Sequence, residues 1–119
     1  MSEAVPDRFR ISTEQDAFVI QFHLPSEIEA LEFDLLNQQL ADAISAHIGG
    51  RWIVDLTTVA YAGSALLGML INIRTRVRKS RGTMVLCRMD PLLERVLRAG
   101  SMDKLFLIVD TREAAFDAL

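Results

Sequence analysis

The residue of this chain that could carry chemistry is Ser64, which follows Gly63 and opens a long run of helix-forming residues. The first N–H groups of a helix have no partner within it, and a serine hydroxyl can accept a hydrogen bond from one of them. The same helix end carries partial positive charge and stabilises a phosphate. Ser64 therefore has two possible roles, as a helix cap or as a phosphorylated residue. Thr57 and Thr58 lie on the preceding loop and are alternative phosphate acceptors.

The motifs of most enzyme classes are absent from the sequence. Gly63 and Gly68 have the spacing of a phosphate-binding loop, but no Lys-Ser/Thr pair follows them. Ser64 has Gly at the position before it and Leu two residues after it, so the G-x-S-x-G nucleophile elbow is absent. His23 and His47 have no Cys, Asp or Glu at metal-ligand spacing, so we expect no metal and no other cofactor. We therefore predict that the protein is not an enzyme, and a small-ligand domain is the weakest of the alternatives.

Composition limits the class of protein. A length of 119 residues predicts one domain, 1–119, with residues 1–7 as a loose end. The net charge of −3 argues against nucleic-acid binding. The longest apolar run, 65–71, is far shorter than the ~18–20 residues that span a bilayer, and the N-terminus has no apolar signal segment. We expect a cytoplasmic protein without membrane insertion, in which the single cysteine, Cys87, is a buried and unreactive thiol.

The spacing of apolar residues predicts the order of the elements. Alternation over 9–13 and 18–22 predicts two strands of an antiparallel hairpin. Helical spacing of apolar residues follows and ends near Gly49-Gly50. After residue 50 strands alternate with helices, which indicates parallel strands joined by crossovers. The predicted strands are 52–55, 83–87 and 105–109, and the predicted helices are 64–81, 91–99 and 112–119, with Asp90 and Thr111 (or Asp110) as caps.

The helix predicted over 64–81 is apolar on nearly every side in its first half. The residues expected to face the sheet are Leu67, Leu70, Ile71 and Val77. Leu66, Met69 and Ile73 would then lie at the edges of this stripe. Either neighbouring helices cover them, or they form an exposed apolar patch for a partner, one turn from Ser64. The second half is basic, which the helix dipole favours and which could also face an acidic partner.

The stretch from Trp52 to Leu119 resembles the STAS domain, and in particular the stand-alone anti-sigma factor antagonists of bacteria. The matching features are the strand Ile53-Val54-Asp55-Leu56, the approach Val59-Ala60-Tyr61 to a serine, a long helix with a basic end at Gly82, and the strand Met84-Val85-Leu86-Cys87. The segments 91–99, 103–106 and 109–115 are also similar, whereas the first 50 residues match only in the order of their elements. The resemblance implies an α/β fold with a mixed sheet, the order β-β-α-β-α-β-α-β-α, and helices packed mainly on one face.

The resemblance also implies a function. In that family a serine that opens the second helix is phosphorylated by a serine kinase that is itself the anti-sigma factor. Unphosphorylated antagonist binds this kinase and frees the sigma factor, whereas phosphorylated antagonist does not bind. The implied partners are an anti-sigma factor serine kinase and, to reverse the modification, a phosphatase. The phosphorylation falls on Ser64, and the partner-binding residues are Tyr61, Gly63, Ser64, Ala65, Leu66 and Met69.

Two residues depart from the family's pattern. Gly63 stands where the family has Asp, and Leu66 stands where it has Gly. A carboxylate before the serine could orient its hydroxyl, and a glycine two residues after it would let a partner approach closely. We therefore expect either an altered kinase partner or a domain that binds without being phosphorylated. The second case is a STAS interaction or scaffold module, comparable to those of stressosomes or transporter accessory subunits.

Overall fold

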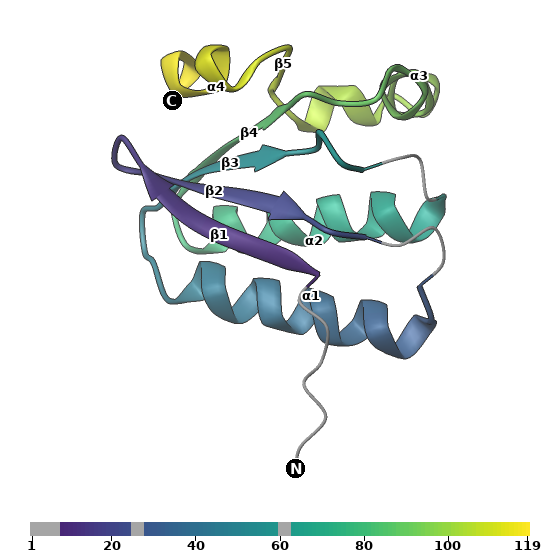
Figure 1. Cartoon of the computed structure of the whole chain (residues 1–119), viewed down its shortest axis with the longest axis horizontal. Coiled ribbons are helices and arrows are strands. Elements are labelled where there is room, and N and C mark those ends of the chain that lie inside the picture. The colour runs from purple at the N-terminus through teal and green to yellow at the C-terminus, as the bar shows by residue number, and fades with distance from the viewer. Residues whose placement is uncertain (1–7, 25–27, 60–62) are drawn as a thin grey trace.

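The computed structural model describes residues 8–24, 28–59 and 63–119, so the predicted loose end, 1–7, lies outside the described residues. Two strands come first, followed by alternating helices and strands (Figure 1). The predicted order is confirmed, with a short 3-10 turn as an addition. The elements are β1 (Phe9–Glu14), β2 (Ala17–Phe22), α1 (Ala30–Ser45), β3 (Arg51–Asp55), α2 (Ser64–Lys79), β4 (Thr83–Cys87), α3 (Pro91–Ala99), η1 (Met102–Leu105), β5 (Ile108–Val109) and α4 (Arg112–Ala118).

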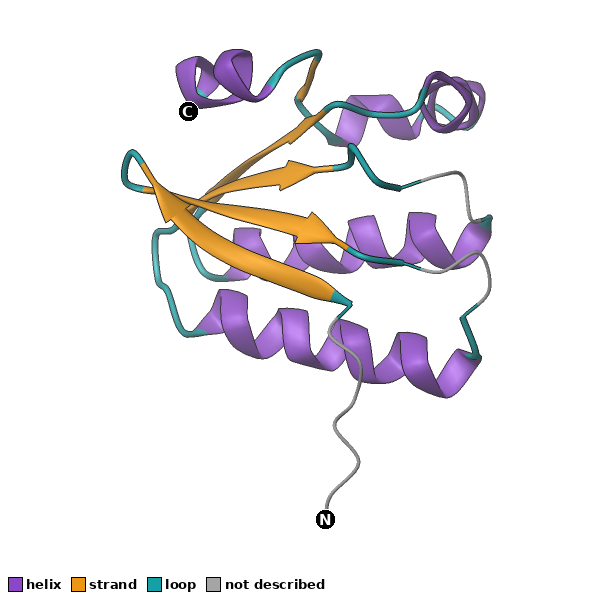
Figure 2. Ribbon diagram, viewed as in Figure 1, coloured by secondary structure: helices purple, strands orange, loops and turns teal. Residues whose placement is uncertain are grey.

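The sheet has five strands in the order β1-β2-β3-β4-β5 (Figure 2). β1 pairs with β2 antiparallel, and β2, β3, β4 and β5 pair in parallel. The mixed sheet is therefore as predicted. Because the central strands are parallel, their carboxyl ends lie at one edge of the sheet, and α1 and α2 begin at the same edge (Figure 1).

The two faces of the sheet are covered unequally. α1 and α2 lie side by side against one face and bury the larger core with Ile20, Trp52, Val54 and Leu86 of the strands. α4 lies on the other face, where Ala115 packs in a small cluster with residues of β2, β3 and β4. Helices therefore cover mainly one face, as the resemblance implied.

The last predicted strand is much shorter than expected. Residues 105–109 were expected to form it, but η1 ends at Leu105 and β5 has only two residues. The Arg74 side chain explains part of the difference, because its Nε donates to the carbonyl oxygen of Leu105 at 2.8 Å and ties this segment to α2. Phe106 is buried against the larger core, while Leu105 and Leu107 are exposed. The segment before β5 is therefore held partly by α2 through Arg74, and it meets the sheet only from Leu107, whose carbonyl oxygen accepts from the N–H of Leu86 at 2.9 Å.

The predicted caps of α3 and α4 are confirmed. The Asp90 side chain accepts a hydrogen bond from the N–H of Leu92 at 2.7 Å, and Pro91 follows it as the first helical residue. Thr111, and not Asp110, caps α4 by accepting from the N–H of Ala114 at 3.0 Å. Each cap satisfies one of the free donors at its helix start.

Two glycines allow the chain to pass closely where β3 and β4 begin. A Cβ on Gly50 would collide with the indole nitrogen of Trp52, and a Cβ on Gly82 would collide with the carbonyl oxygen of Gly50. The N–H of Thr83 donates to that same oxygen at 3.0 Å, which holds the two segments together. Backbone atoms cannot move aside as a flexible side chain can, so the close approach depends on glycine at position 82.

We predict opposite effects of alanine at two glycines. Gly82→Ala should destabilise the protein by about 1–3 kcal/mol, because the new methyl group meets backbone. Gly68→Ala should instead stabilise it by up to about 1 kcal/mol, because Gly68 lies inside α2 with no atom within 4 Å of its missing Cβ. Urea unfolding of both variants measures these changes, and a destabilised Gly68→Ala would contradict the second expectation.

Candidate functional site

A buried carboxylate lies at the carboxyl end of β3. Asp55 is 1% exposed, and its two oxygens have separate partners. Oδ1 accepts from the backbone N–H of Thr57 at 3.0 Å and from the Thr57 hydroxyl. Oδ2 accepts from Nε of Arg112 at 3.1 Å and from its Nη2 at 2.9 Å. The carboxylate therefore holds the loop that leaves β3 and, from the opposite face of the sheet, the beginning of α4.

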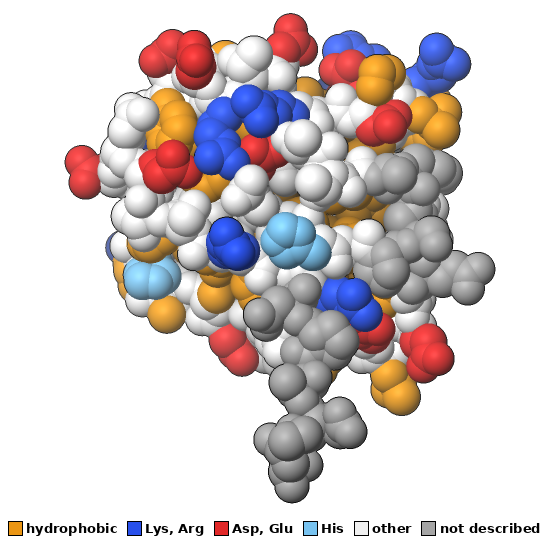
Figure 3. Space-filling model, in the orientation of Figure 1, with side chains coloured by type: hydrophobic (Ala, Val, Ile, Leu, Met, Phe, Trp, Pro, Cys, Tyr) orange, Lys and Arg blue, Asp and Glu red, His pale blue; other side chains and the backbone are white. Residues whose placement is uncertain are grey.

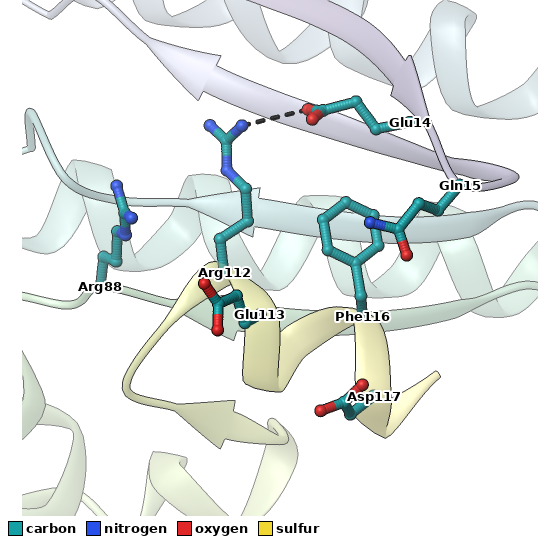
Figure 4. A pocket seen from close by; sticks show the side chains of 7 residues that line it. All are labelled: Glu14, Gln15, Arg88, Arg112, Glu113, Phe116 and Asp117. Carbon is teal, nitrogen blue, oxygen red and sulfur yellow. Dashed lines mark hydrogen bonds and ion pairs between the residues drawn. The ribbon is translucent and has the colours of Figure 1, made fainter.

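Arg112 extends this group to the first hairpin. Its Nη1 donates to Glu14 Oε2 at 3.0 Å (Figure 4). Together with the bonds to Asp55, one guanidinium therefore pairs with two acids. The group borders a hollow of about 480 Å³ between the hairpin and α4. The hollow is lined by Glu14, Gln15, Arg88, Arg112, Glu113, Phe116 and Asp117. Acids outnumber bases in this lining, and no Ser, Cys or His nucleophile is among its residues.

The buried groups beside this network have shifted pKa values. Burial alone raises the pKa of Asp55, but the hydrogen bonds from Thr57 and the charge and hydrogen bonds of Arg112 outweigh it, so the pKa is lowered from 3.8. Burial, and then the nearby Asp55 charge, raise the pKa of the Cys87 thiol to about 11. Cys87 is free and buried, and at neutral pH its thiol stays protonated. The prediction that Cys87 is buried is confirmed, and its raised pKa is in keeping with an unreactive thiol.

The hydroxyls of the two loop threonines are already engaged. Thr57 donates to Asp55, and Thr58 donates to the carbonyl oxygen of Phe22 at the end of β2. A phosphate on either threonine would break a hydrogen bond that fixes the loop. Because of these hydrogen bonds, both threonines are less suitable sites of phosphorylation than a serine whose hydroxyl does not hold the loop in place.

Ser64 is the first residue of α2, as predicted, and it is exposed. The N-cap position belongs to Gly63, and no side chain caps this helix. Of the two roles left open for Ser64, the capping role does not fit this structure, because Ser64 is already the first residue of the helix and lies after the N-cap position. Gly63 has φ 79° and ψ −160°, a conformation that is open essentially to glycine alone.

Of the two alternatives for the apolar residues of α2, the structure shows that Leu66, Met69 and Ile73 are covered and do not form an exposed patch. Leu66 and Met69 are both 0% exposed and belong to the larger core. Leu67 is only partly buried and Ile71 is 37% exposed, although both were expected to face the sheet. α2 packs against α1 as well as the sheet, so its buried surface is wide and turned towards α1. The residues buried on α2 are Leu66, Met69, Leu70, Ile73 and Val77.

The remaining predicted partner-binding residues lie around the helix start. Gly63 is partly exposed, and Ser64 and Ala65 are exposed, so the three form a continuous accessible segment. Tyr61 lies outside the described residues.

Sequence reasoning missed a hollow beside this segment. It has a volume of about 500 Å³ and lies between the first halves of α1 and α2. One signal for it was present in the sequence, since Gly68 is an unfavourable residue inside a helix. The lining residues are Ile28, Ala30, Phe33, Asp34, Asn37, Ala65 and Gly68.

The described residues lack the features of a metal site or a membrane span. Within the described residues, no group of three or more His, Cys, Asp or Glu side chains could hold a metal ion. None of the helices in this part of the chain has the length and apolar character to cross a membrane. On the face seen in Figure 3, acidic and basic side chains of the described residues are interspersed. This mixture is unlike the single basic surface of a nucleic-acid binder.

The chain is similar to a known protein family and to several solved structures. The family model of the STAS domain matches residues 10–115. An anti-sigma-factor antagonist (STAS) domain protein from Planctomyces limnophilus has a TM-score of 0.79 at 21% identity, over 92% of this chain and 96% of that one. An anti-sigma factor antagonist from Mycobacterium paratuberculosis has a TM-score of 0.73 at 21% identity, over 98% and 97%. The Bacillus cell fate determinant SpoIIAA in its phosphorylated form has a TM-score of 0.65 at 15% identity, over 92% and 97%.

The Asp55 network predicts how stability depends on pH. Because folding lowers the pKa of Asp55, the stabilisation is complete well above 3.8 and is lost as the pH falls through that value towards the lower, folded pKa. Arg112→Met should raise the pKa of Asp55 in the folded protein, so this variant should lose less of its stability than the wild type as the pH falls. Arg88→Met is the control. Urea unfolding between pH 7 and pH 3 measures the effect. Equal profiles for the two variants would contradict the role given to Arg112.

A second prediction concerns Gly63. Gly63→Asp would restore the family's residue, yet it should destabilise the protein by about 1–3 kcal/mol because a side chain is strained in this conformation. Gly63→Ala is the matched control and should lose a similar amount, since the strain comes from the backbone. Thermal unfolding compares the three proteins, and a Gly63→Asp variant more stable than the wild type would show that the strain argument fails.

Proposed function

Because the chain belongs to the STAS domain family, we propose that it is an anti-sigma factor antagonist that phosphorylation of Ser64 switches off. Its partner would be an anti-sigma factor with serine-kinase activity, and a phosphatase would reverse the modification. The observation that carries the proposal is the position of Ser64, exposed at the first residue of α2 and not used as a cap. The likeness to several anti-sigma factor antagonists, including a phosphorylated one, supports it.

The beginning of α2 suits a phosphate. A phosphoserine carries about −1.5 to −2 charges at neutral pH. The helix dipole favours such a charge at this end by about 0.3–1 kcal/mol, and the first turn of α2 holds no acidic residue that would oppose it. The fold should therefore tolerate the modification without rearrangement.

A partner docked on this surface would not tolerate it. Among the described residues around Ser64, Ala65 and Gly68 are exposed, and Gly63 and Leu67 are partly exposed. These side chains are small or apolar, so a partner that fits closely over them would have to strip water from a dianion. A loss of about 2–3 kcal/mol makes a complex ~30–150-fold weaker. In this role the protein acts by binding alone in the cytoplasm, with no catalysis, cofactor or membrane insertion of its own.

A second candidate is a STAS interaction or scaffold module without a phosphorylation switch, as in stressosomes or transporter accessory subunits. The observation that favours it is Gly63, which places no carboxylate before the serine. In that case the same surface would bind its partner constitutively.

Phosphorylation can be tested directly by mass spectrometry of the protein purified from the cells that encode it. We expect one phosphate, mapped to Ser64, that disappears in Ser64→Ala and persists in the control Thr75→Ala, an exposed hydroxyl on the same helix. Since Ser64 is not a cap, Ser64→Ala should change the free energy of unfolding by less than about 0.5 kcal/mol.

The binding arm uses calorimetry with the serine-kinase anti-sigma factors of the same organism, each purified singly. Unmodified protein should bind one of them, and the phosphorylated protein should bind it at least ~30-fold more weakly. Absence of phosphate under all growth conditions, together with binding that Ser64→Glu does not weaken, would favour the module without a switch.

A further inference from the structure

The hollow between α1 and α2 contains an unexplained glycine. Gly68 lines it, and apart from neighbouring backbone of α2 no described atom lies within 4 Å of the position where a Cβ would stand. Glycine inside a helix is unfavourable compared with alanine, and the packing of the described residues gives no reason for it. A molecule outside the chain that approaches the α2 backbone closely would give one, as close contacts at glycine do elsewhere.

The walls of the hollow indicate what could enter. Ile28 and Phe33 are partly buried apolar side chains on the α1 side, and Ala65 continues the floor on the α2 side. A volume of about 500 Å³ lies within the range of binding pockets and accommodates a large apolar side chain. A groove between two helices is also a usual docking place for an apolar anchor of a partner.

The charge around the hollow has one sign. Asp34 lines it and is exposed, and Glu29 directly precedes the lining residue Ala30. Neither acid forms an ion pair within the described residues, whereas Glu32 on the same helix is paired with Arg8. α1 contains no Lys or Arg, and the first ten residues of α2, 64–73, contain no charged residue. The groove is therefore apolar inside and acidic at its α1 rim.

We infer that this groove is a second part of the docking surface and takes a segment of the anti-sigma factor in which an apolar side chain is flanked by Lys or Arg. The inference rests on the proposed function and names the chemistry of its partner. The apolar side chain fills the hollow over Gly68, and the cation pairs with Asp34 at the rim. Ser64 and Gly68 are one turn apart on the exposed side of α2, so a phosphate on Ser64 would stand at the mouth of the hollow and obstruct the apolar anchor.

Three variants with matched controls test the inference by calorimetry against the anti-sigma factor that binds the wild-type chain. Gly68→Leu fills the hollow and should weaken binding at least about tenfold. Its control, Thr75→Leu, adds similar bulk to the exposed side of α2 away from the hollow and should bind as the wild type does. Gly68→Ala should raise the melting temperature and yet weaken binding, a combination that a purely structural role cannot produce.

The charge arm reverses one acid at a time. Asp34→Lys should weaken binding about tenfold and reduce its dependence on salt, because one attractive ion pair becomes repulsive. Asp42→Lys makes the same change on the exposed side of α1 outside the lining and should have little effect.

The outcomes separate the two proposals. If the wild type binds and Ser64→Glu does not, while Gly68→Leu and Asp34→Lys bind as the wild type does, the groove inference is overturned and the proposed function stands. If the wild type binds none of the organism's anti-sigma factors, both are overturned. Weak binding of Gly68→Leu and Asp34→Lys with normal binding of both controls supports the groove and its basic, apolar-anchored partner.

Discussion

The arrangement of this molecule depends on the carboxylate of Asp55 at the carboxyl end of β3. A charge that is 1% exposed is stable only when it is paired and hydrogen-bonded, and Thr57 and Arg112 together meet that need. Thr57 belongs to the loop that leads towards α2, whereas Arg112 opens α4 on the opposite face. One side chain therefore holds both the start of the loop that follows β3 and α4 on the opposite face, and Glu14 adds the first hairpin to the same group.

Local patterns predicted the elements well, because each is encoded by neighbouring residues. The strands, the helix starts at Ser64 and Pro91, and the caps of α3 and α4 follow from alternation, helix-forming runs and turn chemistry. The Asp55 network could not be predicted in this way. Asp55 and Glu14 lie 57 and 98 residues before Arg112 along the chain, and only the folded sheet brings the three together. The short β5 has a similar cause, since the side chain of Arg74 binds the Leu105 carbonyl from another helix.

The orientation of α2 shows where sequence periodicity ceases to be informative. Its first half is apolar on nearly all sides, so the sequence allows several rotations about the helix axis. In the fold, α2 packs against both α1 and the sheet, with Leu66 and Met69 in the core and Ser64, Ala65 and Gly68 accessible. The partner surface predicted at the start of α2 therefore loses Leu66 and Met69. The hollow between α1 and α2 takes their place as the apolar feature next to Ser64.

The same orientation gives a physical meaning to the two departures from the family's motif. Leu66 stands where the family has glycine, but it is buried in the core, so its bulk does not obstruct a partner. Residues two apart on a helix point to opposite sides, and Gly68 is accordingly exposed where Leu66 is buried. A partner can therefore still approach the backbone of α2 closely at Gly68. Gly63 supplies no carboxylate, which leaves the first N–H groups of α2 without a competing anion. Neither departure therefore argues against the proposed phosphorylation switch, which needs an accessible serine and a helix end that favours a dianion.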